Sequence, residues 1–404
     1  MIRTDVLIIG GGAAGLAAAL GAEKQGARVL IVESGDLGGI LNRCIHLGFG
    51  LARFGEELTG PEYAARDIAE VKASKRISVI RGTVTSLNSS LEAEIVSESG
   101  YEKVKARSVV LATGCRERAF GALEIAGTRP AGIFTAGAAQ EFVNTEGRGI
   151  GKRIVILGSG DIGLIMARRF TLEGAKVEAV LEIMPHPGGL NRNIAQCLTD
   201  FKIPLELSTT VVEVRGDKRV EEVVVANVDE NLKPIPDTKR TLRCDTLVLS
   251  VGLIPVMNLV PFVQTDRSTK GAVVNSHCMT AAPGIFVCGN ALHVHDLVDN
   301  VSAESERAGR YAALHALGLS GKTELVLLHP GENVASVVPQ LLVKGEDSEV
   351  YIRLKKPLAD GRIVVSGREI SVKKRGAMAP NETVVIKIEG GLIAENITVS
   401  AEGV

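Results

Sequence analysis

Two copies of the glycine-rich fingerprint G-x-G-x-x-G lie 148 residues apart in this chain. The first copy stands in VLIIGGGAAGLAAAL at Gly10–Gly15, and the second stands in IVILGSGDIGLIMA at Gly158–Gly163. Each copy follows a short apolar run and opens a stretch of small and apolar residues, which is the strand–turn–helix context that a nucleotide-binding fingerprint requires. We therefore expect an α/β protein with two Rossmann-like dinucleotide-binding domains.

The three fingerprint glycines have separate physical roles. The first permits a tight turn, the second lets the backbone approach a pyrophosphate, and the third lets the helix pack closely on the strand. The helix N-terminus then offers N–H groups and the positive end of its dipole to the phosphates. Two such turns in one chain can hold two dinucleotides, and we expect the pair to be FAD and NAD(P)H.

Composition limits the kind of protein. The 404 residues suffice for two or three domains, and the formal net charge of −1 gives no sign of a nucleic-acid or anionic membrane partner. No apolar run is long enough for a transmembrane segment, and the stretch Val6–Leu20 is better explained as strand, turn and helix than as a signal peptide. The six cysteines are scattered with no C-x-x-C pair, which argues against zinc and favours a cytoplasmic protein.

The order of the expected elements predicts that one dinucleotide domain is inserted into another. After the second βαβ unit, two short strands over residues 272–289 and a helix from about Val301 to Leu317 would complete the first domain. Beyond about residue 325, short strands alternate with turn signals. We assign residues 1–118 and 251–322 to the two parts of an FAD-binding domain, 119–250 to an NAD(P)-binding domain, and 326–404 to a small all-β C-terminal domain.

The first fingerprint is complete. Glu33 follows Gly12 by 21 residues at the end of the second strand, where an acidic side chain accepts hydrogen bonds from the adenosine ribose. The expected FAD contacts in this part of the chain are Gly10, Gly12, Ala13, Ala14, Gly15, Glu33, Ser34, Gly38, Gly39 and Leu41. The alternative is a Rossmann-like unit that binds no ligand.

The second fingerprint is less complete, because the position equivalent to Glu33 is Leu181 and the acid, Glu182, follows it. Side chains alternate faces along a strand, so a shift of one residue would point the carboxylate elsewhere unless the strand has ended. NAD is favoured over NADP, since residues 182–187 hold no arginine or lysine and Glu182 would repel a 2′-phosphate. The expected NAD contacts are Gly158, Gly160, Asp161, Ile162, Gly163, Glu182 and Gly252. The alternative is a degenerate domain kept for its structure.

Across residues 1–320 the chain resembles the pyridine nucleotide-disulfide oxidoreductase superfamily. Besides the fingerprints, the resemblance is carried by the A-T-G turn at Ala112–Gly114, the G-x-x-P turn at Gly252, and Gly289-Asn290, where the superfamily has Gly-Asp. It implies that Asn290 bonds the ribityl chain with one negative charge fewer, and that a helix starting near Val301 aims its N-terminus at the flavin. The FAD contacts that it implies are Val84, Ala112, Thr113, Gly114, Gly289, Asn290, Val301 and Ser302.

The reactive edge of the flavin is expected near the segment GGILNRCIHLGFG. Disulfide reductases of the superfamily carry two redox cysteines there or a C-x-x-C in the second domain, whereas this segment holds only Cys44. A thiolate beside a flavin can form a charge-transfer pair, and His46 can carry a proton, so we treat both as candidate catalytic residues. The alternatives are an inert buried cysteine and a structural histidine.

A second group of titratable residues, His293-Val-His295-Asp296-Leu-Val-Asp299, follows the second flavin turn. Histidine and aspartate can ligate metals, but this spacing is not distinctive. We expect no metal here, and interpret the segment as a polar loop over the flavin or at a contact with another chain.

The resemblance narrows at GGILNRCIHLGFG and at CGNALHVHDLVDNVSAESERAG. These segments resemble the companion oxidoreductase of FAD-dependent glycerol-3-phosphate dehydrogenase and, more distantly, the α subunits of sarcosine oxidase and opine or proline dehydrogenase. The resemblance implies an electron-transfer subunit of a hetero-oligomer, with a dehydrogenase subunit or a small redox protein as its partner. The alternatives are a self-sufficient NADH oxidase or ferredoxin-type reductase, and a flavin-bearing scaffold subunit with an inactive second site.

Overall fold

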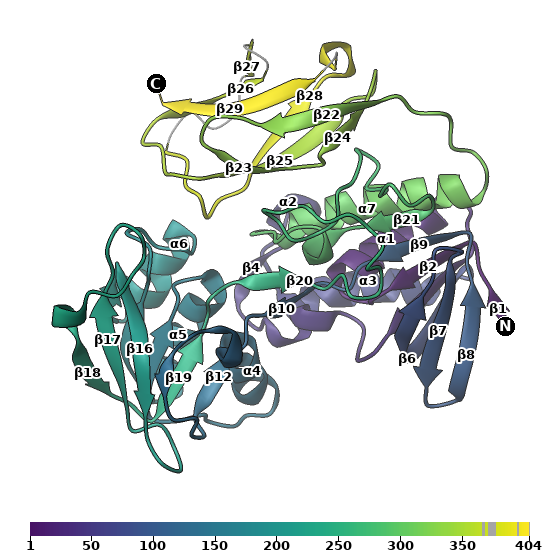
Figure 1. Cartoon of the computed structure of the whole chain (residues 1–404). Coiled ribbons are helices and arrows are strands. Elements are labelled where there is room, and N and C mark those ends of the chain that lie inside the picture. The colour runs from purple at the N-terminus through teal and green to yellow at the C-terminus, as the bar shows by residue number, and fades with distance from the viewer. Residues whose placement is uncertain (366–367, 371–376, 394–395, 404) are drawn as a thin grey trace. The chain divides into compact units, whose positions relative to one another are not determined.

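The structure, a computed structural model, describes residues 1–365, 368–370, 377–393 and 396–403. It divides into two compact units (Figure 1). The first unit comprises Met1–Cys115 and Pro255–Val404, and the second comprises Arg116–Ile254.

The chain passes from one unit to the other through two short strands. β10 (Cys115–Glu117) and β20 (Leu253–Pro255) pair as a two-stranded sheet at these crossings. The second unit therefore begins and ends a few residues outside the predicted range 119–250. The segment predicted as a C-terminal domain, 326–404, groups with the first unit, and residues 366–367, 371–376, 394–395 and 404 of it lie outside the described residues.

The first unit is built on an eight-stranded sheet in the order β1-β8-β7-β6-β3-β2-β9-β21, in which β6, β3, β2, β9 and β21 run parallel. Side chains of β2 alternate between two cores, since Val6 and Ile8 face one and Leu7 and Ile9 the other. Both faces are covered, which explains why the strand is apolar at every position. The strands are β1 (Ile2–Arg3), β2 (Val6–Ile9), β3 (Val29–Glu33), β6 (Ile77–Leu87), β7 (Glu92–Ser97), β8 (Gly100–Lys105), β9 (Ser108–Leu111) and β21 (Ile285–Val287).

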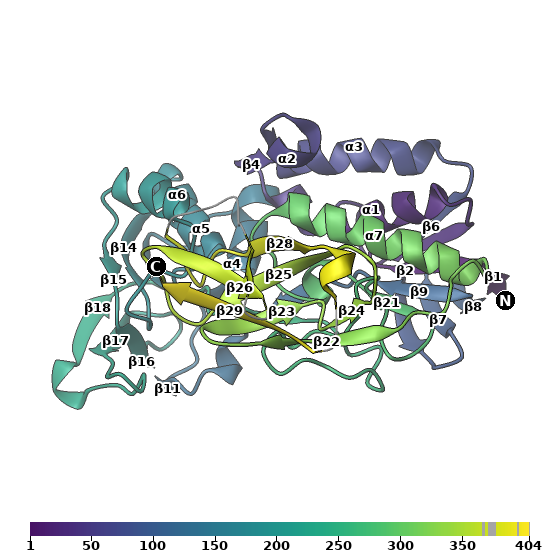
Figure 2. The same cartoon turned by 90° about the horizontal axis from the view of Figure 1, so that it is seen from above.

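Three helices, α1 (Ala13–Glu23), α3 (Gly60–Ala73) and α7 (Val298–Ala316), lie side by side along one face of this sheet (Figure 2). α1 and α7 approach so closely that a Cβ at Gly21 would lie 2.3 Å from Glu306 O, and one at Gly309 would lie 1.9 Å from Ala18 O. The small residues that run through α1 are therefore required for helix packing as well as for the nucleotide turn. Short elements precede α3: η1 (Gly39–Arg43), β4 (Leu47–Phe49), α2 (Leu51–Phe54) and β5 (Leu58–Thr59).

The second unit contains a five-stranded parallel sheet in the order β12-β19-β13-β14-β15 and a four-stranded sheet in the order β11-β16-β17-β18. The repeated βαβ unit consists of β13 (Arg153–Leu157), α5 (Asp161–Leu172) and β14 (Lys176–Leu181). The remaining elements are β11 (Ala126–Gly127), β12 (Ile133–Thr135), α4 (Ala136–Gln140), α6 (Asn191–Ile194), β15 (Leu205–Glu206), β16 (Thr209–Arg215), β17 (Glu222–Asn227), β18 (Arg240–Arg243) and β19 (Thr246–Leu249).

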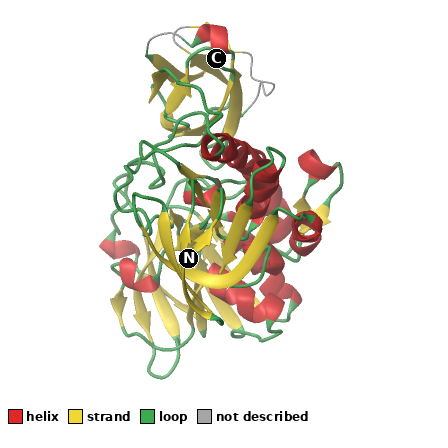
Figure 3. Cartoon of the chain, turned by 90° about the vertical axis from the view of Figure 1, so that its right-hand side faces the viewer, coloured by secondary structure: helices red, strands yellow, loops and turns green. Residues whose placement is uncertain are grey.

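The described residues after 324 form two sheets, β24-β22-β29-β26-β27 and β23-β25-β28, around their own apolar core (Figure 3). They join the rest of the first unit through hydrogen bonds, including Val274 N–H to Gln340 Oε1 at 3.0 Å and a 2.8 Å contact between the Ser276 and Ser348 hydroxyls. The strands are β22 (Leu325–Pro330), β23 (Val334–Val338), β24 (Leu341–Val343), β25 (Ser348–Leu354), β26 (Gly361–Val365), β27 (Arg368–Ile370), β28 (Val384–Ile388) and β29 (Ile397–Gly403).

Two local predictions were wrong. Of the two short strands predicted over residues 272–289, only β21 forms, because the Val274 backbone bonds to Gln340 and Leu341 instead of to a neighbouring strand of the main sheet. The last helix, predicted from about Val301 to Leu317, forms over Val298–Ala316 and so begins earlier than predicted. In the described part of the chain, no helix has both the length and the apolarity needed to cross a membrane.

Candidate functional site

The first fingerprint turn is held closed by two contacts that leave no room for side chains. Gly10 has a φ of +105°, and a Cβ there would lie 2.4 Å from Ala112 O. A Cβ at Gly15 would lie 1.8 Å from Gly10 O. Glycine is therefore required at both positions, and the A-T-G turn lies directly against the fingerprint.

The turn opens at Gly12, where a dinucleotide phosphate would approach. A Cβ at Gly12 would meet no atom closer than the Gly39 Cα, 4.0 Å away. Gly12 is the N-cap of α1, and no side chain caps the helix that begins at Ala13. The first N–H groups of α1 are thus left without a side-chain acceptor beside open space, which fits a pyrophosphate.

Glu33 lies at the end of β3 with its carboxylate turned back to the fingerprint. Its Oε2 accepts a hydrogen bond from Gly11 N–H at 2.6 Å, and its Oε1 accepts one from Gly35 N–H at 2.7 Å. The Ser34 hydroxyl contacts Oε1 at 3.3 Å. A carboxylate can accept about four hydrogen bonds, so capacity remains for a ribose hydroxyl.

The segment after Glu33 folds back over the turn. Gly38, with a φ of +103°, donates its N–H to Gly11 O at 2.8 Å, and a Cβ at Gly39 would lie 3.1 Å from the Gly12 Cα. Leu41 is buried and packs in a cluster that includes Ala13. The structure thus gathers all the expected FAD contacts between residues 10 and 41 around one turn.

The second flavin turn, Gly289-Asn290, meets the start of α1. A Cβ at Gly289 would lie 2.6 Å from the Ala14 Cβ and 3.3 Å from Val301 Cγ1, so these predicted contacts are neighbours. Asn290 accepts a hydrogen bond on Oδ1 from His295 N–H at 3.0 Å and directs its amide nitrogen to Cys115 Sγ at 3.7 Å. The Asn290 side chain therefore contacts both Cys115, which follows the A-T-G turn, and His295 of the segment 293–299, which we call the histidine loop.

Thr113 and Gly114 connect this site to the returning chain. The Thr113 hydroxyl donates to Val256 O at 2.7 Å, and Val256 N–H donates to Gly114 O at 3.0 Å. Val84 lies in β6 and pairs with Ile95 of β7. The pairing of β6 with β3 ends earlier, at Arg81, so Val84 lies beyond it. Its backbone edge on the β3 side pairs with no strand in the described chain.

Ser302 differs from its predicted setting. Because α7 begins at Val298, Ser302 lies inside the helix rather than at its first turn, and its hydroxyl contacts the Tyr63 hydroxyl at 2.8 Å. Arg53 donates to Tyr63 at 3.3 Å and forms an ion pair with Asp67 at 2.7 Å. Both Ser302 and Tyr63 are fully buried, so this chain of polar groups fixes α7 against α3.

Cys44 and His46 follow η1 and are both half-buried. Cys44 O accepts a hydrogen bond from Gly60 N–H at 2.8 Å, and His46 Nδ1 lies 2.9 Å from Leu47 O with its ring beside Phe49. None of the six cysteines forms a disulfide.

Of the other five cysteines, Cys115 is half-buried and four are buried. Cys197, Cys244, Cys278 and Cys288 are buried, and we refer to them as the four buried cysteines. Burial raises the pKa of Cys197 to about 11 and those of Cys244 and Cys278 to about 12, and it holds the pKa of Cys288 well above the ordinary value. These four thiols are therefore poor nucleophiles at neutral pH.

The second fingerprint repeats the first turn. A Cβ at Gly158 would lie 2.1 Å from Ser250 O, and one at Gly163 would lie 2.7 Å from the Ser250 Cβ. Gly160 is the N-cap of α5, whose first residues are Asp161 and Ile162. No N-cap side chain bonds to the start of this helix. Gly252 has a φ of +102° and open space around it, and its carbonyl accepts a hydrogen bond from Arg118 N–H at 3.2 Å.

A β-bulge in the second copy removes the one-residue offset that the sequence predicted between Glu182 and the position of Glu33. In the first copy β2 and β3 pair without interruption, from Val6 with Val29 to Ile9 with Val32. In the second, Ile154 pairs with Val177 but Val155 pairs with Ala179, so one extra residue is accommodated in β14. The bulge shifts the rest of the strand by one position, and Glu182, not Leu181, follows the last pair as Glu33 does.

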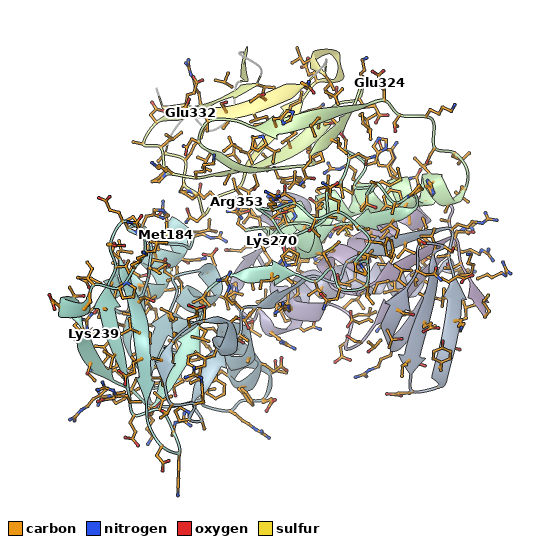
Figure 4. All side chains as sticks on the ribbon, viewed as in Figure 1. Met184, Lys239, Lys270, Glu324, Glu332 and Arg353 are labelled. Atoms are coloured by element: carbon orange, nitrogen blue, oxygen red, sulfur yellow. The ribbon has the colours of Figure 1, made fainter. Side chains whose placement is uncertain are left out.

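The carboxylate of Glu182 consequently makes the contacts that Glu33 makes. Its Oε2 accepts hydrogen bonds from Ser159 N–H at 3.0 Å and the Ser159 hydroxyl at 2.6 Å, and its Oε1 accepts one from Met184 N–H at 2.9 Å. Met184, labelled in Figure 4, begins the loop that returns to the fingerprint. In that loop Gly188 N–H donates to Ser159 Oγ at 2.7 Å, and Leu190 N–H donates to Asp161 at 2.8 Å.

Comparison with known proteins identifies the family of this chain. The sequence profile of the family described as pyridine nucleotide-disulphide oxidoreductase matches residues 4–307. The chain belongs to this family. This family uses FAD and NAD(P)H, in agreement with the cofactors expected from the sequence, and the residues around the two turns are suited to hold FAD and a nicotinamide dinucleotide.

Individual relatives are distant. A sarcosine oxidase subunit alpha from Corynebacterium sp. (strain P-1) is 27% identical over 383 residues, which is 82% of this chain but 36% of that subunit. A thioredoxin reductase from Treponema pallidum (strain Nichols) is 27% identical over 314 residues, covering 71% of this chain and 88% of the enzyme. The crystal structure of Lactococcus lactis thioredoxin reductase superposes with a TM-score of 0.65 at 21% identity, over 78% of this chain and 100% of that chain. This last likeness confirms the α/β fold.

The sequence predicted only part of one buried cluster in the first unit. His293 and His295 converge on Glu304 of α7, which the spacing of the histidine segment did not indicate. Burial, together with the neighbouring His295, lowers the pKa of His293 to about 4. Burial by itself would raise the pKa of Glu304, but the two imidazoles hold that pKa well below its ordinary value. Glu304 also accepts a hydrogen bond from Gly289 N–H at 2.8 Å, behind the second flavin turn.

Proposed function

We propose that this oxidoreductase transfers hydride equivalents between NAD(H) and FAD and exchanges the electrons with a separate dehydrogenase subunit. The observation that carries the proposal is the equivalence of Glu33 and Glu182, each of which binds back to the fingerprint turn of its own site. Two turns with the same geometry favour two bound dinucleotides over one dinucleotide and a degenerate domain. FAD supplies the two-electron chemistry when bound, and the chain supplies position and electrostatics.

In this proposal the first turn holds FAD. The uncapped start of α1 at Gly12 and Ala13 receives the pyrophosphate, and the Glu33 carboxylate receives the ribose hydroxyls. Asn290 stands near the ribityl chain and presents an uncharged amide there. Cys44 and His46 are candidates for groups at the reactive edge.

The second turn holds NAD in preference to NADP. The Glu182 carboxylate at the turn would repel a 2′-phosphate, and residues 182–187 supply no arginine or lysine to pair with one. A 2′-phosphate is normally recognised by an arginine or a comparable cation, and the lack of one in this segment also favours NAD.

We infer that electrons leave the flavin by a route other than a redox cysteine pair. No C-x-x-C occurs, and the four buried cysteines have raised pKa values. The similarity to a sarcosine oxidase subunit alpha and the resemblance of residues 38–50 and 288–309 to glycerol-3-phosphate dehydrogenase companions both favour a partner subunit as the donor or acceptor.

Isolation of the native complex from the source cells tests this assignment. Recovery of the chain with a flavin-dependent dehydrogenase, in a complex that reduces NAD when glycerol 3-phosphate is added, is the predicted result. A chain that elutes alone and turns over oxygen or an artificial acceptor at full rate with NADH would instead be a self-sufficient oxidase or ferredoxin-type reductase. A flavin that neither NADH nor NADPH bleaches would indicate the scaffold subunit.

A further inference from the structure

A triad of His293, His295 and Glu304 lies within the first unit, behind the flavin turn and apart from both fingerprints. The two histidines come from the loop after η6 (Gly289–Ala291), and the glutamate comes from the second turn of α7. One ligating atom from each side chain can be chosen so that all three lie within 4.8 Å of one another.

The distances in this triad suit a single bound ion. His293 Nε2 lies 2.9 Å from Glu304 Oε2, and His295 Nε2 lies 3.3 Å from Glu304 Oε1. Nitrogen and oxygen ligands about 2.0–2.2 Å from one tetrahedral zinc ion lie about 3.3 Å from each other. The two imidazole–carboxylate separations of 2.9 and 3.3 Å lie close to this value, so side-chain shifts would admit an ion between the imidazoles and the carboxylate.

The triad is dry and its hydrogen bonding is incomplete. The side chain of His295 has 0% of its surface exposed, that of Glu304 has 1%, and that of His293 has 6%. His295 Nδ1 is buried and has no hydrogen-bond partner in the described part of the chain. The hydrogen bonds of the described residues therefore leave one buried nitrogen of the triad unsatisfied, although buried polar atoms are normally paired.

The cationic groups around the triad have acidic partners of their own. Two guanidinium groups lie in this region, and each is engaged by another acid: Arg307 contacts Glu349 at 2.8 Å, and Arg353 (labelled in Figure 4) lies 4.0 Å from Asp296. The Tyr351 ring covers both imidazoles, with centroid distances of 5.1 Å to His293 and 5.4 Å to His295.

We propose that His293, His295 and Glu304 bind a divalent transition-metal cation of the zinc type. Two imidazoles and one carboxylate form a ligand set that zinc, iron and similar ions accept, whereas magnesium and calcium prefer oxygen ligands alone. Three protein ligands leave one coordination position for water. The spacing of residues 293–299 was not distinctive, because the third ligand, Glu304, lies on the following helix.

The position of the ion implies a structural role for the flavin turn. Glu304 Oε1 accepts the Gly289 N–H, and Tyr351 belongs to β25. An ion on Glu304 would fix the Gly289 turn, the histidine loop and the Tyr351 ring relative to one another. Its loss should loosen flavin binding without touching either fingerprint.

Metal analysis of the full-length, untagged flavoprotein tests the proposal. We expect about one equivalent of zinc or another first-row metal per chain by plasma mass spectrometry. After treatment with a chelator, Zn²⁺ at about a hundred times its Kd should raise the Tm by roughly 3–5 °C, and Mg²⁺ should not. Co²⁺ should give a visible ligand-field band at wavelengths beyond the flavin absorption.

Variants separate the triad from other histidine–glutamate pairs. Glu304→Gln and His295→Ala should lose the metal and the Co²⁺ band. His277→Ala is the matched control, because His277 pairs with Glu346 at 2.7 Å and stacks on Tyr311 without a second histidine, and it should keep both.

The wild-type measurements stand even where a triad variant fails to fold. Less than about a tenth of an equivalent of metal, together with neither a Tm rise with Zn²⁺ nor a Co²⁺ band, would overturn the proposal. None of these readouts depends on NADH oxidation, so a negative result here leaves the proposed function unaffected.

Discussion

Glutamine substitutions at Glu182 and Glu33 should weaken the binding of two different dinucleotides. Each carboxylate accepts a hydrogen bond from the residue after the first fingerprint glycine, Ser159 in one site and Gly11 in the other. If the bulge in β14 makes the sites equivalent, Glu182→Gln should impair NADH binding and leave FAD in place. Glu33→Gln should impair FAD retention and leave the second turn intact.

The size of the effect follows from the acceptors that remain. Glu182 takes three donors in the structure, at 2.6, 2.9 and 3.0 Å, which leaves about one of its four acceptor positions for a ribose hydroxyl. A hydrogen bond to a charged group contributes about 1.5–3 kcal/mol, so its loss should raise the Kd for NADH by roughly 10- to 150-fold. The glutamine amide also turns an N–H toward one of the three donors, which should lower the Tm by a few degrees.

Anaerobic stopped-flow absorbance at the flavin band provides the assay. The dependence of the bleaching rate on NADH concentration gives the Kd, and the flavin spectrum gives the FAD content of each variant. An unchanged Kd in folded Glu182→Gln protein would refute the equivalence of the two acids. Equal loss of FAD in both variants would refute their separate roles.

Three further predictions concern the first unit and the thiols. Gly15→Ala should reduce the FAD-to-protein ratio at least tenfold, because its Cβ would lie 1.8 Å from a backbone oxygen, whereas Gly149→Ala, in open space, should keep full FAD content. Tyr63→Phe should lower the Tm by about 1–5 °C in a thermal melt, since Ser302 loses its partner at about 1–3 kcal/mol; an unchanged Tm would argue against that polar chain. Native alkylation at pH 8, followed by peptide mapping, should spare the four buried cysteines, whose thiolate fraction is about 0.001 or less at a pKa of about 11 or higher; labelling at those four would contradict their burial.

The two nucleotide turns could be predicted because their requirements are local. Gly10 and Gly15 are needed by contacts within one strand–turn–helix unit, and the acid at Glu33 follows in uninterrupted strand pairing. The same argument placed Leu181 at the equivalent position in the second copy. It failed there because a bulge in β14 adds one residue between two paired strands, and the sequence carries no mark of it.

The remaining features depend on contacts between segments distant in sequence. Ser302 bonds to Tyr63, and the irregular segment near Val274 bonds to Gln340, so neither could be placed from local periodicity. Glu304 likewise joins the histidine loop only because α7 packs against the turn at Gly289. Periodicity predicts which face of an element is buried, but it does not identify the partner on that face.

Anaerobic titration of the purified flavoprotein with NADH tests the central claim most directly. If both turns hold their dinucleotides, about one equivalent of NADH should bleach the flavin band, and NADPH should do so more slowly. Retention of the full flavin absorbance in the presence of excess NADH and NADPH would contradict hydride transfer between the two sites.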